Sequence, residues 1–108
     1  MDMRTETRDG HLIVTLKQSR LDARVAPGFR RALEAAIAQG HDSIVLDLSE
    51  VTFMDSSGLG AVVAILKAMK GGELRIVGLQ RAVQELFRLT RMDSIFRCHD
   101  DVGSALSA

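Results

Sequence analysis

The sequence predicts an α/β domain in which a mixed, mostly parallel β-sheet of four to five strands packs against helices. Three observations lead to this fold class. A hairpin-like segment lies near the amino terminus, strand-like and helix-like segments then alternate, and a length of 108 residues suits a single domain. Parallel neighbouring strands need crossover helices, so the alternation favours parallel pairing after the hairpin. We therefore expect one domain that spans residues 1–108.

The first half of the chain begins with two strand-like segments, residues 5–8 and 11–16. They flank Asp9-Gly10, a dipeptide that suits the positive φ angles of a tight hairpin turn. Apolar residues then recur with helical spacing at Val25, Phe29, Leu33 and Ile37. Pro27 suits the first turn of this predicted helix, and Gly40 ends it.

The second half alternates strands and helices. Residues 43–48 form a short, β-branched, mostly apolar run, which is typical of a strand buried on both faces. Helical spacing of apolar residues predicts a second helix over about residues 56–70 and a third over residues 83–90, with a strand at 74–77 between them. Near the carboxyl terminus, Asp100 and Asp101 are candidate caps for a last short helical turn.

Composition restricts the partners and the compartment that we expect. Fourteen basic and fourteen acidic residues give zero formal charge without a long block of one sign, so we expect no binding to nucleic acid. The longest uncharged apolar run, residues 61–66, is far below the roughly 20 residues that span a bilayer. We therefore expect a cytoplasmic protein without membrane insertion. We expect the lone Cys98 to be a small buried hydrophobic residue rather than a reactive thiol.

The most informative segment is D-L-S-E-V-T-F-M-D-S-S-G-L-G at positions 47–60, which leads from a predicted buried strand into a helix amino terminus. The first N–H groups of a helix lack intrahelical partners and carry partial positive charge, so a phosphate is favoured there. At least one hydroxyl of Ser56 and Ser57 should be exposed, and Gly58 and Gly60 remove side-chain bulk beside it. Taken alone, the pattern also fits an ordinary helix cap.

Three features together resemble the STAS (sulphate transporter and anti-sigma antagonist) domain family, in particular the bacterial anti-sigma factor antagonists. They are the Asp9-Gly10 hairpin, Arg20-Leu21-Asp22 before the first helix, and the segment at 47–60. The resemblance implies that an anti-sigma factor with serine kinase activity phosphorylates the second serine of D-S-S-G, which is Ser57 here. It further implies that the unphosphorylated form binds this kinase and frees a sigma factor, and that a phosphatase reverses the modification.

The family motif also implies a set of partner-binding residues. By position in the motif these are Asp22, Asp55, Ser56, Gly58 and Leu59. One departure is visible, because Ser19-Arg20 stands where family members commonly have glycine before the Leu-Asp pair. We expect this difference to affect the loop and the choice of partner rather than Ser57.

Other chemistry has weaker support in the sequence. The nucleophile elbow of hydrolases needs glycine two residues before its serine, whereas Met54 and Asp55 occupy those positions, so we expect no catalytic activity. Gly58-Leu59-Gly60 lacks the third glycine of a dinucleotide fingerprint, and adjacent residues in Cys98-His99-Asp100-Asp101 point to opposite faces of an extended chain. We expect neither a cofactor nor a metal, and a monomer or weak dimer. The alternative function is a non-switching STAS scaffold or accessory subunit, for example one associated with a transporter.

Overall fold

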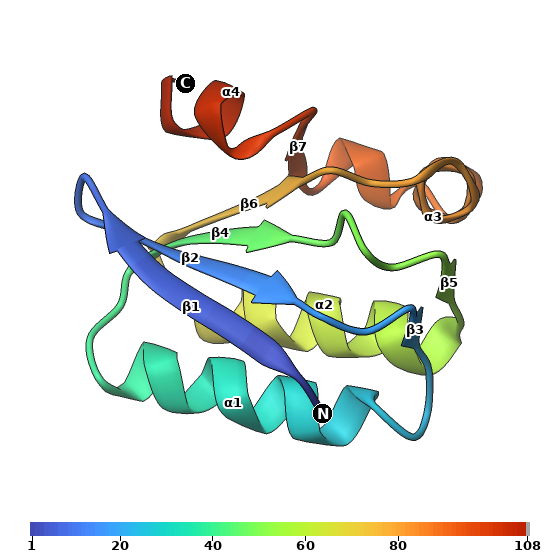
Figure 1. Ribbon diagram of the computed structural model, residues 1–108, viewed down its shortest axis with the longest axis horizontal. Helices are drawn as coiled ribbons and strands as arrows, with labels where there is room; N and C mark the ends of the chain where they lie inside the picture. The colour runs from blue at the N-terminus through green and yellow to red at the C-terminus, as the bar shows by residue number, and fades with distance from the viewer. Residues whose placement is uncertain (108) are drawn as a thin grey trace.

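The computed structural model describes residues 1–107, so the predicted domain extends one residue beyond the described part. The chain order of the elements is as follows: β1 (Met3–Arg8), β2 (His11–Leu16), β3 (Arg20–Leu21), α1 (Ala26–Ala38), β4 (Ser43–Asp47), β5 (Phe53–Met54), α2 (Ser56–Ala68), β6 (Glu73–Val77), α3 (Arg81–Leu89), the 3₁₀ turn η1 (Met92–Ser94), β7 (Arg97–His99) and α4 (Val102–Ser107). This order confirms the predicted alternation of strands and helices (Figure 1).

A mixed sheet with the order β1-β2-β4-β6-β7 runs through the described residues. β1 pairs antiparallel with β2, with Arg8 opposite His11 at the turn, and each later pair in this sheet is parallel. Asp9 and Gly10 have φ angles of 53° and 79°, as a tight hairpin turn requires. The predicted class, an α/β fold with an amino-terminal hairpin and a mostly parallel sheet, is confirmed.

The sheet separates two apolar layers. α1, α2 and α3 pack their apolar faces on one side, where Phe29, Ile65 and Phe87 belong to the main core. α4 lies on the opposite side, where Ala105 packs on Ile13, Val45 and Val77 (Figure 1). Residues 44–46 of β4 are fully buried between these layers, which confirms the prediction of a central strand covered on both faces.

Two strands of two residues each, β3 and β5, form a separate small parallel sheet beside the start of α2 (Figure 1). Arg20 pairs with Phe53, and Leu21 pairs with Met54. Leu21 and Met54 are buried, whereas Arg20 and Phe53 face solvent. This small sheet fixes the loop before α1 next to the amino terminus of α2, so it positions the segment that the sequence singled out.

Two sequence predictions need correction. α2 ends at Ala68, two residues before the predicted end. Lys70 and Gly71 have positive φ angles of 28° and 85°, and an α-helix cannot continue through residues with positive φ. Cys98 is exposed rather than buried. It lies on the edge strand β7, which has only one neighbouring strand, and the side chain opens into a surface hollow instead of the core.

Candidate functional site

The turn from β5 to α2 is a fully formed helix cap. Asp55 is the N-cap residue, and its Oδ1 accepts a hydrogen bond of 3.0 Å from the backbone N–H of Gly58. Its carbonyl accepts the N–H of Leu59 at 3.0 Å. Ser56 and Ser57 occupy the first two helical positions, where backbone N–H groups have no intrahelical acceptor. Both serines are exposed, so either hydroxyl is accessible to a partner protein.

Gly58 lets the small β3–β5 sheet pack tightly against α2. A Cβ atom at this position would lie 2.1 Å from the carbonyl oxygen of Leu21 and 2.9 Å from Cγ of Met54, both too close for a real contact. The N–H of Asp55 also donates to the carbonyl of Leu21 at 3.4 Å. Gly58 is therefore buried and serves the internal packing of the site, whereas Gly60 faces open space.

Asp22 organises the loop that leads into α1. Its Oδ1 accepts the backbone N–H groups of Arg24 at 3.1 Å and Val25 at 3.3 Å, and its Oδ2 accepts Nε of Arg20 at 3.3 Å. Desolvation acts to raise the pKa of Asp22, but the hydrogen bonds from Arg20 and from the two backbone groups outweigh it, so the pKa lies below its ordinary value. Asp22 is thus a carboxylate at neutral pH, held beside the β3–β5 sheet.

Arg20 and Phe53 form an exposed pair on the small sheet. The guanidinium carbon of Arg20 lies 4.2 Å from the centroid of the Phe53 ring, which is a cation–π arrangement. The Phe53 side chain is 40% exposed although it is large and apolar. Together with the ion pair from Arg20 to Asp22, this arrangement places an aromatic ring and two charges close to the start of α2.

A shallow hollow of about 370 Å³ lies between the amino-terminal halves of α1 and α2. Its lining is made of small residues, both serines and one basic side chain, namely Ala23, Ala26, Pro27, Arg30, Ser56, Ser57, Gly60 and Ala61. The predicted phosphorylation site thus opens onto a depression. Among the predicted site residues, Ser56 and Ser57 line this hollow, Asp22 and Asp55 hold the backbone around it, and Leu59 packs partly against the core.

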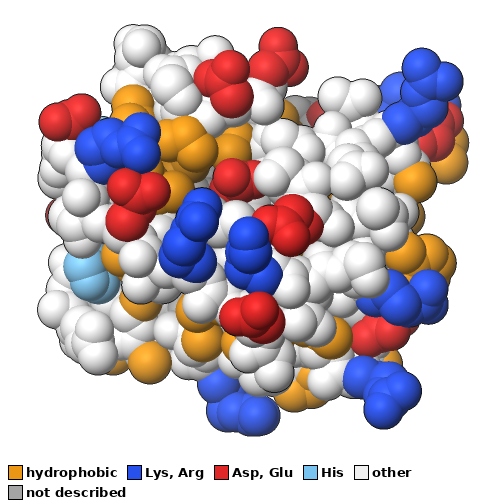
Figure 2. All heavy atoms as spheres, viewed as in Figure 1, with side chains coloured by type: hydrophobic (Ala, Val, Ile, Leu, Met, Phe, Trp, Pro, Cys, Tyr) orange, Lys and Arg blue, Asp and Glu red, His pale blue; other side chains and the backbone are white. Residues whose placement is uncertain are grey.

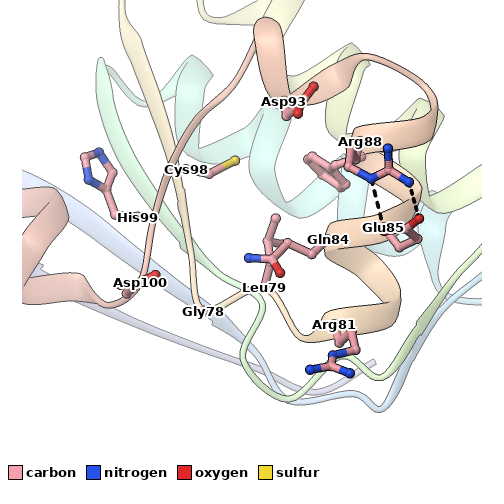
Figure 3. Close-up of a pocket in the computed structure, with 11 residues that line it drawn as sticks. Gly78, Leu79, Arg81, Gln84, Glu85, Arg88, Asp93, Cys98, His99 and Asp100 are labelled. Atoms are coloured by element: carbon pink, nitrogen blue, oxygen red, sulfur yellow. Dashed lines mark hydrogen bonds and ion pairs between the residues drawn. The ribbon is translucent and has the colours of Figure 1, made fainter.

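A larger hollow of about 650 Å³ lies elsewhere, between α3 and the end of β7 (Figure 3). Its polar side chains are mixed in charge, and Glu85 is paired with Arg88. Cys98 is exposed but partly desolvated by its surroundings. This desolvation and then the nearby Asp93 carboxylate raise its pKa, so it is mainly a protonated thiol and a poor nucleophile at neutral pH. Neither serine of the motif lines this hollow.

The distribution of charge, the acidic and sulphur side chains and the lengths of the helices bear on other classes of site. Figure 2 shows acidic and basic side chains interspersed on the face that it displays, without one large block of a single sign. Residues 1–107 contain no group of three or more His, Cys, Asp or Glu side chains placed to hold a metal ion. In the same part of the chain, no helix is long and apolar enough to cross a membrane.

Sequence reasoning missed the Arg20–Phe53 pair and the hollow beside Ser57. Arg30, which lines this hollow, is exposed and paired with Glu34 at 3.2 Å. The hollow depends on how α1 packs against α2, and no local pattern in the sequence reports that packing. The small residues at the start of both helices are the one feature of the sequence that points to a hollow there.

Comparisons with known proteins agree with this architecture. The anti-sigma-B factor antagonist of Listeria monocytogenes is 35% identical over 100 residues, which cover 89% of this chain and 86% of that protein. The crystal structure of an anti-sigma factor antagonist from Mycobacterium paratuberculosis has a TM-score of 0.90 at 27% identity, with 98% of this chain and 91% of that chain covered.

A more distant structure shares the fold alone. It is the Bacillus cell fate determinant SpoIIAA in its phosphorylated form, with a TM-score of 0.74 at 19% identity. The match covers 98% of this chain and 97% of that chain. The family model described as the STAS domain matches residues 2–105. This match covers nearly all of the described residues, from β1 to α4. The chain belongs to the STAS domain family.

Proposed function

We propose that this protein is an anti-sigma factor antagonist whose binding state is set by phosphorylation of Ser57. The single observation that carries the proposal is the position of Ser57, which is exposed at the second residue of a capped helix and opens onto a surface hollow. Relatives with the name anti-sigma factor antagonist support it. The proposed partner-binding surface includes Asp22, Asp55, Ser56 and Leu59 beside Ser57. Gly58 is buried, so its proposed part is to hold the β3–β5 sheet against α2 and not to contact the partner.

The proposed partner is an anti-sigma factor that is also a serine kinase. The unphosphorylated antagonist binds this kinase, so the kinase releases its sigma factor. In the modification step, the Ser57 Oγ attacks the γ-phosphorus of ATP, a new O–P bond forms, the hydroxyl proton is lost and ADP leaves. A separate phosphatase hydrolyses the phosphoserine and restores the binding form. This chain supplies the acceptor hydroxyl, and its function requires no catalytic group of its own.

Electrostatics explains why phosphorylation would stop binding. The phosphate adds about −1.5 to −2 charges at neutral pH to a side chain that was small and neutral. The free helix N–H groups and the helix dipole stabilise such an anion by about 0.3–1 kcal/mol, so the fold tolerates it. Burial of the same anion in an interface shaped for a hydroxyl costs several kcal/mol unless the partner provides cations, and each 1.4 kcal/mol weakens affinity about tenfold.

The test compares Ser57→Asp, Ser57→Ala and the matched control Ser56→Ala by calorimetric titration against the kinase-type anti-sigma factor. We expect Ser57→Asp to lower affinity by at least about tenfold with little change in thermal stability. Ser57→Ala should bind like the unmodified protein. Ser56 lies on the same proposed surface, so Ser56→Ala serves as the control for the site of modification and not for affinity. Incubation with the kinase and ATP should add one phosphate to Ser57 in the Ser56→Ala variant and none in Ser57→Ala.

Two results would overturn the proposal. One is a phosphate that maps to a residue other than Ser57. The other is an unchanged affinity both for Ser57→Asp and for protein phosphorylated at Ser57. The first result would overturn the assignment of Ser57 as the acceptor, and the second would leave the chain as a non-switching scaffold.

A further inference from the structure

The hollow beside Ser57 is built from two helix faces that meet. On α2, Ser57, Gly60 and Ala61 share one face because they are three and four residues apart. Residues 23–30, at the start of α1 and just before it, supply the opposite wall, and every lining side chain there except Arg30 is small. A Cβ atom at Gly60 would meet nothing within 4 Å, so space remains open one turn beyond Ser57. The hollow therefore has room for a group larger than a hydroxyl.

Arg30 is the one charged side chain that lines this hollow. Its Nε donates to Oε2 of Glu34 at 3.2 Å, and the side chains are 53% and 39% exposed. An ion pair with this much exposure to solvent contributes little, so it holds the guanidinium weakly. The two terminal nitrogens of Arg30 make no hydrogen bond within residues 1–107. Arg30 is thus free to exchange Glu34 for a stronger anion.

We propose that Arg30 binds the phosphoryl group of phosphorylated Ser57 across this hollow and gives up its contact with Glu34. The proposal rests on the phosphorylation of Ser57 put forward above. Arg forms paired hydrogen bonds with phosphate, and these are stronger than its bonds to an exposed carboxylate because the phosphate carries more charge. Neighbouring arginines are less suited, because neither Arg20 nor Arg31 lines the hollow.

The bound state has a functional consequence. A phosphate held by Arg30 fills the hollow from within the same molecule, so the hollow is closed to a partner side chain. The phosphate is also partly shielded from a phosphatase. Phosphorylation would then act by occupying the surface as well as by repelling the partner.

The experiment uses full-length protein with phosphoserine placed at position 57 by recoded translation, so no kinase is needed. Phosphorus NMR measures the second pKa of the phosphate, ordinarily about 6, in the parent protein and in two variants. Arg30→Gln removes the proposed ligand, and Arg31→Gln is the matched control on the next residue. We expect Arg30→Gln to raise this pKa by about 0.5 units or more, because a nearby cation favours the dianion. Arg31→Gln should leave it within about 0.2 units of the parent value.

A second measurement tests the exchange of partners. Glu34→Gln removes the competing carboxylate, so the pKa of the phosphate should stay the same or fall. Equal pKa values in the parent, Arg30→Gln and Arg31→Gln proteins, each folded by circular dichroism, would overturn the proposal. This outcome differs from failure of the proposed function, in which phosphorylation leaves the affinity for the anti-sigma partner unchanged whatever Arg30 does.

Discussion

Gly58 shows how one residue links the fold to the candidate site. The helix cap needs its N–H as a donor to Asp55, and the packing of β3 needs the absence of its Cβ. Gly60 lies only two residues later in the same helix, yet it faces open space. The two glycines of the motif therefore have different physical roles, although the sequence presents them as a pair.

This difference predicts opposite effects of the same substitution. Gly58→Ala should destabilise the protein by about 1–3 kcal/mol, because the new methyl group forces the backbone of Leu21 away from α2. Gly60→Ala should stabilise it by about 0.5–1 kcal/mol, because alanine restricts the unfolded chain and meets no obstacle in the helix. Urea denaturation of both variants beside the parent protein measures the change. Equal effects of the two substitutions would contradict the assigned contact with Leu21.

At the level of elements, the β3–β5 sheet presents Phe53 beside the amino terminus of α2. Aromatic residues, Phe among them, are enriched in protein interfaces relative to the rest of the surface. Phe53→Ala should therefore lower affinity for the anti-sigma partner by about tenfold or more. It should reduce stability by only about 0.5–1 kcal/mol, the usual contribution of an exposed cation–π pair.

The matched control for Phe53 is Ile95→Ala. Ile95 is 54% exposed and lies between η1 and β7, an edge strand of the main sheet, and it is not part of the β3–β5 sheet. This variant should bind the partner like the parent protein in the same titration. If Phe53→Ala also bound like the parent, the β3–β5 sheet would have to be left out of the proposed interface.

The longer elements could be predicted from the sequence, whereas the contacts that assemble the site could not. The hairpin at Asp9-Gly10, the buried strand at 43–48 and the first helix each contain a local pattern of turn residues or apolar spacing. β3 and β5 are two residues long, too short to show any period. Their pairing, and the contact of Leu21 with Gly58, join residues more than thirty positions apart. Such contacts are set by tertiary packing, so a single sequence does not reveal them.

For the whole molecule, the balance of charge depends strongly on pH. Fourteen acidic residues offset fourteen Lys and Arg at neutral pH. Three carboxylates in separate parts of the chain have pKa values below their ordinary range. The hydrogen bond from the backbone N–H of Ser104 is the main cause of the lowered pKa of Asp101, and the hydrogen bond from Arg88 is the main cause for Glu85. For Asp22, the hydrogen bonds from Arg20 and from the loop backbone outweigh desolvation, which acts to raise its pKa. Folding therefore holds these groups in their charged form.

Stability should consequently fall as the solution becomes acidic. A carboxylate whose folded pKa is lowered stabilises the native state above its unfolded pKa, and this contribution is lost as pH falls through the folded pKa. The unfolded chain takes up protons first, near pH 4, and the native state then carries a growing excess of positive charge that repels itself. We expect the urea midpoint to stay nearly constant from pH 7 to about 5 and to decrease steadily from about 5 to 3.

Asp101→Ala tests the local part of this prediction, and Asp100→Ala is the control. Asp101 accepts the N–H of Ser104 at 2.8 Å and so caps α4, whereas Asp100 makes no hydrogen bond within residues 1–107. Asp101→Ala should lower the urea midpoint at pH 7 and reduce its dependence on pH, because the variant has already lost one of the charged contacts. Asp100→Ala should follow the parent curve at pH 7. A parent midpoint that stayed flat or rose between pH 5 and 3 would show that these carboxylates do not contribute to the stability of the fold.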